Sequence, residues 1–284
     1  MPKNKDRTMK PEYREQQRAI TAALKVAAVF DVQAEIERRI AFLCDYLLDT
    51  QRRSYVLGIS GGVDSLAAAL LAQAAVQRAR ERGHDARFIA MRLPYGVQAD
   101  EADAQRSLAL IKPDTVMTVD IRPAADAMLA AVNAGGAAFR DAGHQDFVLG
   151  NIKARQRMIA QFAVAGATDG LVIGTDQAAE ALMGFFTKFG DGACDLTPLT
   201  GLTKRRVRAI AARFGAEESL VYKVPTADLE SLAPLKPDEA AFGVSYDEID
   251  DFLEGREISD NAAGTILRQY RATAHKRALP VEPY

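Results

Sequence analysis

Short apolar runs alternate along the chain with longer stretches in which apolar residues return at helical spacing. Four of the runs have the length and composition of buried β-strands, and they lie at 55–59, 87–91, 115–119 and 170–174. Helical patterns follow the first three runs, at 65–79, after 98 and after 122, and a long one at 147–165 precedes the fourth. Strands that alternate with helices in this way predict a Rossmann-like α/β fold, in which a doubly wound parallel sheet is flanked by helices.

Further helices are predicted before and after this alternation, as appendages of one domain that spans residues 1–284. Residues 1–10 have charge but no apolar pattern, and we expect them to be flexible. Residues 11–29 predict a helix on the outside of the protein, at an interface. Asp31 is a suitable N-cap for a second helix, whose apolar stripe we expect to pack on the sheet. Near the other end, helices are predicted at 203–214, 246–253 and 260–273.

Composition limits the kinds of partner. The 284 residues carry a net charge of −2, which gives no overall field toward nucleic acid or anionic lipid. The sequence has no apolar run long enough for a membrane span and no signal peptide, so we expect a cytoplasmic protein. The two cysteines have no metal-ligand spacing, and Cys44 has the surroundings of a core residue. His84 and His144 are expected to be exposed rather than catalytic.

The chemistry begins at the turn between the first strand and its helix, where residues 60–65 read SGGVDS. Backbone amides and the helix dipole converge on an anion at such a place, and the hydroxyls of Ser60 and Ser65 add donors. Asp64 would repel a triphosphate unless a hard cation such as Mg²⁺ stood between them. The turn differs from the Walker and dinucleotide patterns because no lysine follows its glycines and the glycines are adjacent. It therefore predicts a site for a triphosphate and a hard cation such as Mg²⁺.

The SGGxDS pattern resembles the ATP-pyrophosphatase family, whose members activate a carbonyl or carboxyl oxygen as an adenylate. Further blocks are similar to the ammonia-dependent NAD synthetases within that superfamily. These blocks read GNIKARQRM at 150–158, GTDQAAE at 174–180, GFFTKFGDG at 184–192, DLTPLTGLTK at 195–204, PTADL at 225–229 and HKR at 275–277. One position departs from the pattern, since Gln177 stands where the family leads us to expect histidine.

The resemblance implies a role for each matching residue. The residues expected to bind ATP are Gly58, Ile59, Ser60, Gly61, Gly62, Val63, Asp64, Ser65, Arg92, Gln98, Thr175, Lys204 and Thr226. The residues expected to bind deamido-NAD are Phe147, Arg155, Lys188, Asp191, Asp195, His275 and Lys276. Asp64 and Glu180 are expected to hold Mg²⁺ and to act in catalysis with Lys204. The segment 185–195 is expected to be a loop that orders around a ligand, and the segment 225–237 is predicted as a second loop.

The implied reaction is the ATP-dependent amidation of deamido-NAD by ammonia, through an NAD-adenylate, to give NAD, AMP and pyrophosphate. Members of this family are homodimers, and the helices at 11–51 are suited to form the interface. The protein is expected to bind neither nucleic acid nor membrane. Two alternatives remain: another adenylating enzyme that modifies tRNA or a nucleotide, and a non-catalytic nucleotide-binding regulator.

Overall fold

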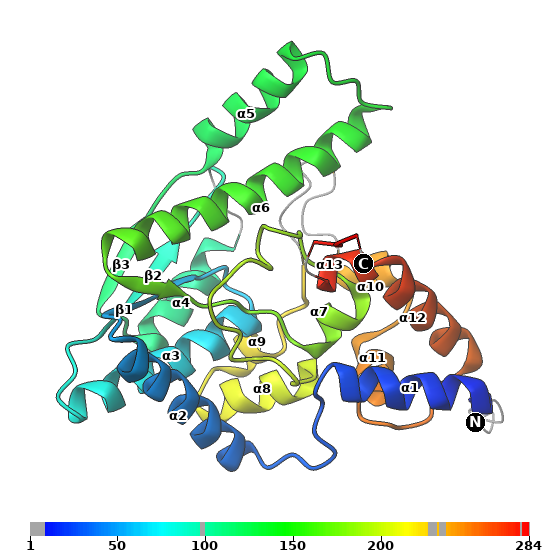
Figure 1. Ribbon diagram of the computed structural model, residues 1–284, viewed down its shortest axis with the longest axis horizontal. Coiled ribbons are helices and arrows are strands. Elements are labelled where there is room, and N and C mark those ends of the chain that lie inside the picture. Colours follow the sequence, from blue (N-terminus) through cyan, green and yellow to red (C-terminus); the bar gives the residue numbers. More distant parts are fainter. Residues whose placement is uncertain (1–8, 97–99, 227–231, 233–236, 279, 284) are drawn as a thin grey trace.

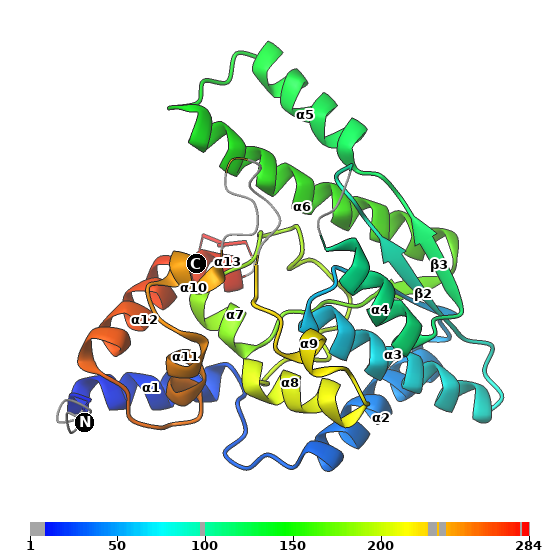
Figure 2. The same cartoon turned by 180° about the vertical axis from the view of Figure 1, so that it is seen from behind.

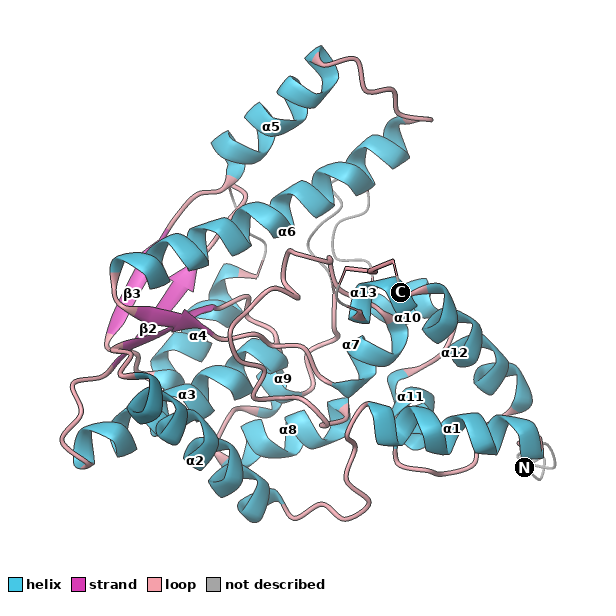
Figure 3. Ribbon diagram, viewed as in Figure 1, coloured by secondary structure: helices cyan, strands magenta, loops and turns pink. Residues whose placement is uncertain are grey.

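A computed structural model describes residues 9–96, 100–226, 232, 237–278 and 280–283. Its centre is a sheet of four parallel strands in the order β3-β2-β1-β4 (Figures 1 and 3). The strands are β1 (Ser54–Gly58), β2 (Arg87–Arg92), β3 (Thr115–Thr118) and β4 (Gly170–Val172). Tyr55 of β1 lies between Phe88 of β2 and Leu171 of β4. The chain extends the sheet to one side of β1 and then crosses to the other side, which confirms the predicted doubly wound topology.

Helices cover both faces of the sheet because its central strands β1 and β2 are apolar on both sides. Tyr55 and Leu57 belong to a core shared with α3 (Val63–Glu81), α2 (Val32–Thr50), α4 (Glu101–Ile111) and α8 (Lys204–Arg213). Val56, between them, points to the opposite core, which α6 (Ala142–Ala167) covers. The antiparallel pair of α5 (Arg122–Ala134) and α6 projects beyond the sheet (Figures 1 and 2).

The appendages form a second, smaller core beside the sheet. It combines α1 (Pro11–Ala23), α7 (Ala178–Met183), α10 (Asp238–Phe242), α11 (Tyr246–Leu253) and α12 (Asp260–Ala272). The remaining short helices are α9 (Glu218–Val221) and α13 (Ala274–Arg277). Segments from both ends of the chain therefore pack together. Because α7 follows β4 in the chain, it connects this second core to the edge of the sheet.

Several boundaries differ from the sequence-based expectation. The first helix ends at Ala23 rather than near residue 29, and Lys25 adopts a left-handed conformation after it. Met9, within the segment expected to be flexible, is buried against the appendage helices. The stripe of α2 packs mainly on α3, which itself covers the sheet. The helices α7, α9, α10 and α13 were not predicted, because four to six residues are too few to show a helical period.

Two predicted helix caps and one predicted core residue are confirmed. Asp31 caps α2 by accepting a hydrogen bond from the Ala34 amide, and Thr203 caps α8. Cys44 is fully buried. Within the described ranges, every helix is too short or too polar to cross a membrane.

Candidate active site

The glycine turn lies at the carboxyl end of β1 and leads into α3. Gly61 has a φ of +86°, and a Cβ atom there would come within 3.1 Å of the Ala104 amide nitrogen. The position therefore requires glycine for both conformation and space. The Ser60 hydroxyl lies 3.1 Å from the Ser65 hydroxyl and accepts a hydrogen bond from the Gly62 amide. These contacts fix the turn around the start of α3, where free amides favour an anion.

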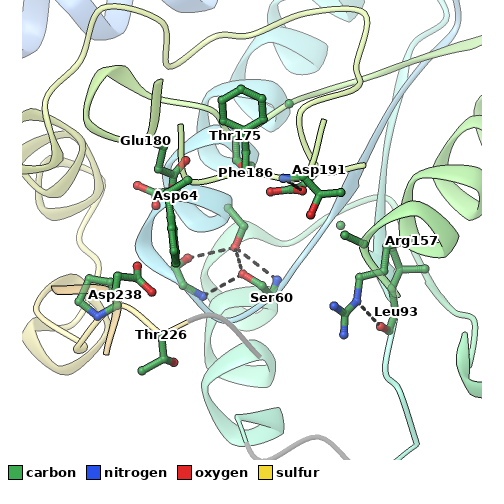
Figure 4. Close-up of a pocket in the computed structure, with 18 of the residues that line it drawn as sticks. Ser60, Asp64, Leu93, Arg157, Thr175, Glu180, Phe186, Asp191, Thr226 and Asp238 are labelled. Carbon is green, nitrogen blue, oxygen red and sulfur yellow. Dashed lines mark hydrogen bonds between the residues drawn. The ribbon is translucent and has the colours of Figure 1, made fainter. Parts of the chain in front are cut away.

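A cavity of about 440 Å³ opens beside this turn at the carboxyl edge of the sheet. Most of the residues predicted to bind ligands line it. They are Gly58, Ile59, Ser60, Gly62, Val63, Asp64, Ser65, Phe147, Thr175, Glu180, Asp191, Lys204, Thr226 and Lys276. Elements far apart in the sequence thus meet around one space (Figure 4).

The three predicted catalytic side chains lie together in this cavity. Asp64 and Glu180 are neighbours (Figure 4). The Lys204 ammonium forms an ion pair with Asp64. Burial raises the pKa of Glu180 well above its ordinary value, and the adjacent Asp64 raises it further. Burial lowers the pKa of Lys204, but Asp64 and Glu180 outweigh this effect and the net pKa is raised. The lysine therefore stays protonated between two acids that repel each other.

These two acids fit a divalent cation. One carboxylate oxygen of Asp64, Oδ1, is buried and accepts no hydrogen bond from the described residues. No group of three or more His, Cys, Asp or Glu side chains in the described ranges could hold a metal ion. The chain would thus supply two ligands, and phosphate oxygens and water would supply the rest, as is usual for Mg²⁺.

Two further carboxylates lie at the same place. Burial raises the pKa of Asp176 to about 7, and Asp191 and Asp64 add to this effect. Burial also raises the pKa of Asp191, although its carboxylate accepts a hydrogen bond from the Thr187 amide. The site therefore holds four acids within mutual electrostatic reach, which an apo protein tolerates only at a cost in stability.

The Asp176 carboxyl is expected to make the protein less stable as the pH rises. Its folded-state pKa of about 7 exceeds the ordinary value of 3.8, so the folded chain holds this proton more tightly than the unfolded chain. The resulting stabilisation is complete below about pH 4 and is lost as the pH rises to about 7, and on the order of 4 kcal/mol is involved. Denaturant unfolding of the wild type and Asp176→Asn, at about pH 5 and about pH 8, measures it. Equal pH dependence in the two proteins would contradict the assignment.

Gln177 replaces the expected histidine as the N-cap of α7. Its Oε1 accepts a 2.6 Å hydrogen bond from the Ala179 amide, at the start of the helix that carries Glu180. A histidine nitrogen can accept the same bond, so the departure keeps the capping function.

We expect Gln177→His to retain activity within about threefold, whereas Gln177→Ala should lose about 1 kcal/mol of stability together with part of kcat, because the cap is missing. Steady-state kinetics and urea unfolding of both variants check this. An inactive but stable His variant would show that the amide itself has a chemical role.

Some predicted residues do not reach the cavity. Arg92, expected beside adenine, is buried behind it, where its guanidinium donates to the Ile59 carbonyl and pairs with Glu101. Asp195 accepts a 2.7 Å hydrogen bond from the Val172 amide and thereby extends the edge of β4. Gln98 lies outside the described residues.

The remaining exceptions have local partners. The Arg155 guanidinium donates to the Lys188 carbonyl, and the Lys188 ammonium donates to the His275 carbonyl at 2.6 Å. Gly61 packs against α4 rather than facing the cavity. His84 and His144 are half-buried, and neither lines the cavity.

Charged residues that received no role from the sequence also belong to this region. Lys223 and Asp238 line the cavity, and Asp176 lies within electrostatic reach of Asp64. Arg157, which the sequence suggested for a pyrophosphate or a carboxylate together with Arg155, lines the cavity as well. Asp176 stands inside a motif that we quoted, so its neighbours were a signal. Lys223 and Asp238 flank the PTADL loop, and only the folded chain brings them to the site.

A glycine turn, a buried lysine and paired acids at the carboxyl edge of a parallel sheet define an α/β nucleotide-binding enzyme. Residues 35–280 match the family model described as NAD synthase. An NH(3)-dependent NAD(+) synthetase from Burkholderia lata is 64% identical over 269 residues, which cover 95% of either chain. The chain therefore belongs to the NAD synthase family and is a ligase.

Solved structures agree with this assignment. The crystal structure of an NAD+ synthetase from Burkholderia pseudomallei is 60% identical, with a TM-score of 0.83 over 95% of this chain and 99% of that one. The structure of an NMN synthetase from Francisella tularensis is 32% identical, with a TM-score of 0.78 over 90% of this chain and 99% of that one. The fold and the helical appendages are thus those of known relatives.

Proposed function

We propose that this protein is an ammonia-dependent NAD synthetase, which uses ATP to convert the nicotinate carboxylate of deamido-NAD into the amide of NAD. The observation that carries the proposal is the convergence of Asp64, Glu180 and Lys204 on one cavity beside the glycine turn. The 64% identity with a relative of that name supports the same substrates. We also propose that the protein is cytoplasmic.

The first step forms the NAD-adenylate. A carboxylate oxygen of deamido-NAD attacks the α-phosphorus of ATP, the bond between the α- and β-phosphates breaks, and pyrophosphate leaves. The glycine turn positions the phosphates, and the Lys204 ammonium stabilises the charge that grows on the departing oxygens. Asp64 and Glu180 are the residues that would hold Mg²⁺, which neutralises phosphate charge when bound.

The second step forms the amide. Ammonia attacks the acyl carbon of the adenylate, the carbon–oxygen bond breaks, and AMP leaves with the former carboxylate oxygen. The nitrogen must lose one proton, and the Asp191 carboxylate, which lines the cavity and has a raised pKa, is suited to accept it.

Neither cysteine of the chain is suited to release ammonia from glutamine. Cys44 is fully buried, and burial raises the pKa of Cys194 to about 12. A glutaminase nucleophile needs a reactive thiolate. Free ammonia is therefore the nitrogen source that we propose.

The decisive assay supplies the purified protein with ATP, Mg²⁺ and ammonium, together with either deamido-NAD or nicotinate mononucleotide. We expect NAD and one equivalent each of AMP and pyrophosphate from deamido-NAD. Amidation of the mononucleotide alone would assign the activity for which the Francisella relative is named. Product from neither substrate would overturn the proposal.

We further propose that the enzyme is a homodimer that pairs through α6 and its surroundings. Exposed apolar side chains lie on α6 and on α5, which packs against it, and they are Met128, Phe147, Ile159 and Phe162. Phe147 also lines the cavity, and Arg155 of the same helix is expected to bind deamido-NAD. A second copy on this face would lie next to the substrate and complete its site.

Phe162→Glu should convert a dimer into a monomer, because it places a charge among the exposed apolar side chains of α6. Sedimentation velocity measures the outcome. The matched control is Phe42→Glu on α2, which lies in the N-terminal segment that the sequence favoured as the interface. Dissociation by Phe42→Glu alone would move the interface to that segment.

A further inference from the structure

Lys223 connects one wall of the cavity to the glycine turn. Its ammonium lies 2.7 Å from a carboxylate oxygen of Asp103 and 3.3 Å from one of Asp100. It also donates to the Gly61 carbonyl at 3.4 Å. The side chain is partly exposed and lines the cavity, and neither Lys223 nor its two acidic partners were among the expected site residues.

The wall itself is made of two short segments, 223–226 and 237–238. They are joined by a bridge between Thr226 and Pro237 and by a hydrogen bond from the Asp238 amide to the Pro225 carbonyl. Thr226 is expected to bind ATP. The position of this wall relative to the phosphates of bound ATP therefore depends on how residue Lys223, at its start, is attached to the rest of the protein.

The glycine turn and the start of α4 form the other side of the contact. A Cβ atom on Gly61 would lie 3.3 Å from both the Asp100 carbonyl oxygen and the Asp103 Cβ atom. The turn thus packs directly on the helix start that carries both acids. Three segments, the wall, the turn and the start of α4, meet at one ammonium group.

The charges at this contact bear on the binding of a triphosphate. Asp100 lines the cavity, and Asp103 is beside it on the same helix turn. The hydrogen bond from Lys223 holds the pKa of Asp103 below its ordinary value, although burial opposes this. Without the lysine, two carboxylates next to the phosphate turn would repel ATP.

We propose that Lys223 is a positioning residue for ATP, which ties the Thr226 wall to the glycine turn and neutralises the acids of α4. It acts through these groups and takes no part in the chemical steps. The inference rests on the proposed function only in that ATP is the nucleotide bound.

The test measures the Kd of ATP with Mg²⁺ by calorimetry, without the second substrate. Lys223→Met should weaken ATP binding about tenfold, since it removes the cation that lies between two partly buried acids beside the glycine turn. Lys223→Arg should restore affinity to within about threefold, because a guanidinium can reach both carboxylates. Lys223→Met combined with Asp103→Asn should recover part of the loss, because one of the two negative charges beside the glycine turn is removed.

The matched control is Arg106→Met. Arg106 also pairs with Asp103, but it extends toward Glu217 and does not line the cavity. Its Kd for ATP should equal that of the wild type. If Lys223→Met unfolds more easily than this control, Lys223→Gln replaces it, and the same weakening is expected because the charge is lost.

Kinetics separate this inference from the proposed function. If the wild type forms NAD, Lys223→Met should raise the KM for ATP about tenfold and leave kcat and the KM for deamido-NAD within about threefold. If the wild type forms no NAD, the proposed function fails while the Kd measurement still decides the role of Lys223. An unchanged Kd in Lys223→Met, or an equal loss in Arg106→Met, would overturn the inference.

Discussion

Glu180→Gln is expected to abolish catalysis and at the same time to stabilise the apo protein. The variant loses one of the two carboxylates suited to Mg²⁺, so pyrophosphate release should fall at least about 1000-fold. The carboxylate is buried next to Asp64, and both burial and that neighbour raise its pKa. An uncharged amide of the same size removes this repulsion, and the free energy of unfolding should rise by about 1 kcal/mol or more.

Asp64→Asn provides the informative contrast. It should lose as much activity as Glu180→Gln, but it should not gain stability, because Asp64 is ion-paired with the buried Lys204. Pyrophosphate release and urea unfolding without Mg²⁺ measure both effects. Glu37→Gln, which changes an exposed acid paired with Arg78, is the control and should behave as the wild type. If either Glu180→Gln or Asp64→Asn released pyrophosphate at the normal rate, that residue would not be a ligand of Mg²⁺.

These opposite effects on activity and stability have a physical origin. Asp64, Asp176, Glu180 and Asp191 are close enough to influence one another's charge, and Lys204 is the buried cation directly paired with one of them. A ligand-free site of this kind holds excess negative charge, which a cation between the acids and the phosphates can balance. The fold therefore carries a local cost in stability that substrate binding would relieve.

The sequence predicted those parts of the site that depend on local pattern. The SGGVDS turn follows from a strand, two glycines and a helix start that are contiguous, and its place at the carboxyl end of β1 is confirmed. The meeting of Asp64 with Glu180 and Lys204 came from the family resemblance. More than a hundred residues separate Asp64 from either partner, and no periodicity specifies such a contact.

Side-chain direction accounts for most of the differences between the predicted site residues and the residues that line the cavity. Arg92 stands at the end of β2, but it points away from the cavity that its neighbours Met91 and Leu93 line. Arg155 and Arg157 are two positions apart on α6, which places them on nearly opposite sides of the helix, and only Arg157 lines the cavity. The phase of a helix against its sheet depends on tertiary packing, so the sequence could not decide between them.

Lys204→Met is expected to lower kcat about 100-fold or more, because it removes the cation placed where charge grows on the departing pyrophosphate. The ammonium is almost fully buried, paired with Asp64 and 5.1 Å from the centre of the Tyr246 ring. A planar guanidinium differs in shape from an ammonium and would not keep both contacts, so Lys204→Arg should not restore the rate.

The matched control is Arg205→Met at the next position, whose guanidinium pairs with Asp251 and Glu254 on and beside α11. It should retain kcat within about twofold. Burst kinetics of pyrophosphate release separate chemistry from binding. A Lys204→Met variant that binds ATP weakly but releases pyrophosphate at the normal rate would show that the lysine stabilises the bound substrate and not the transition state. Normal ATP affinity with a slow burst would show instead that Lys204 stabilises the transition state. Asp64 would then keep the ammonium in position until the phosphoanhydride bond begins to break.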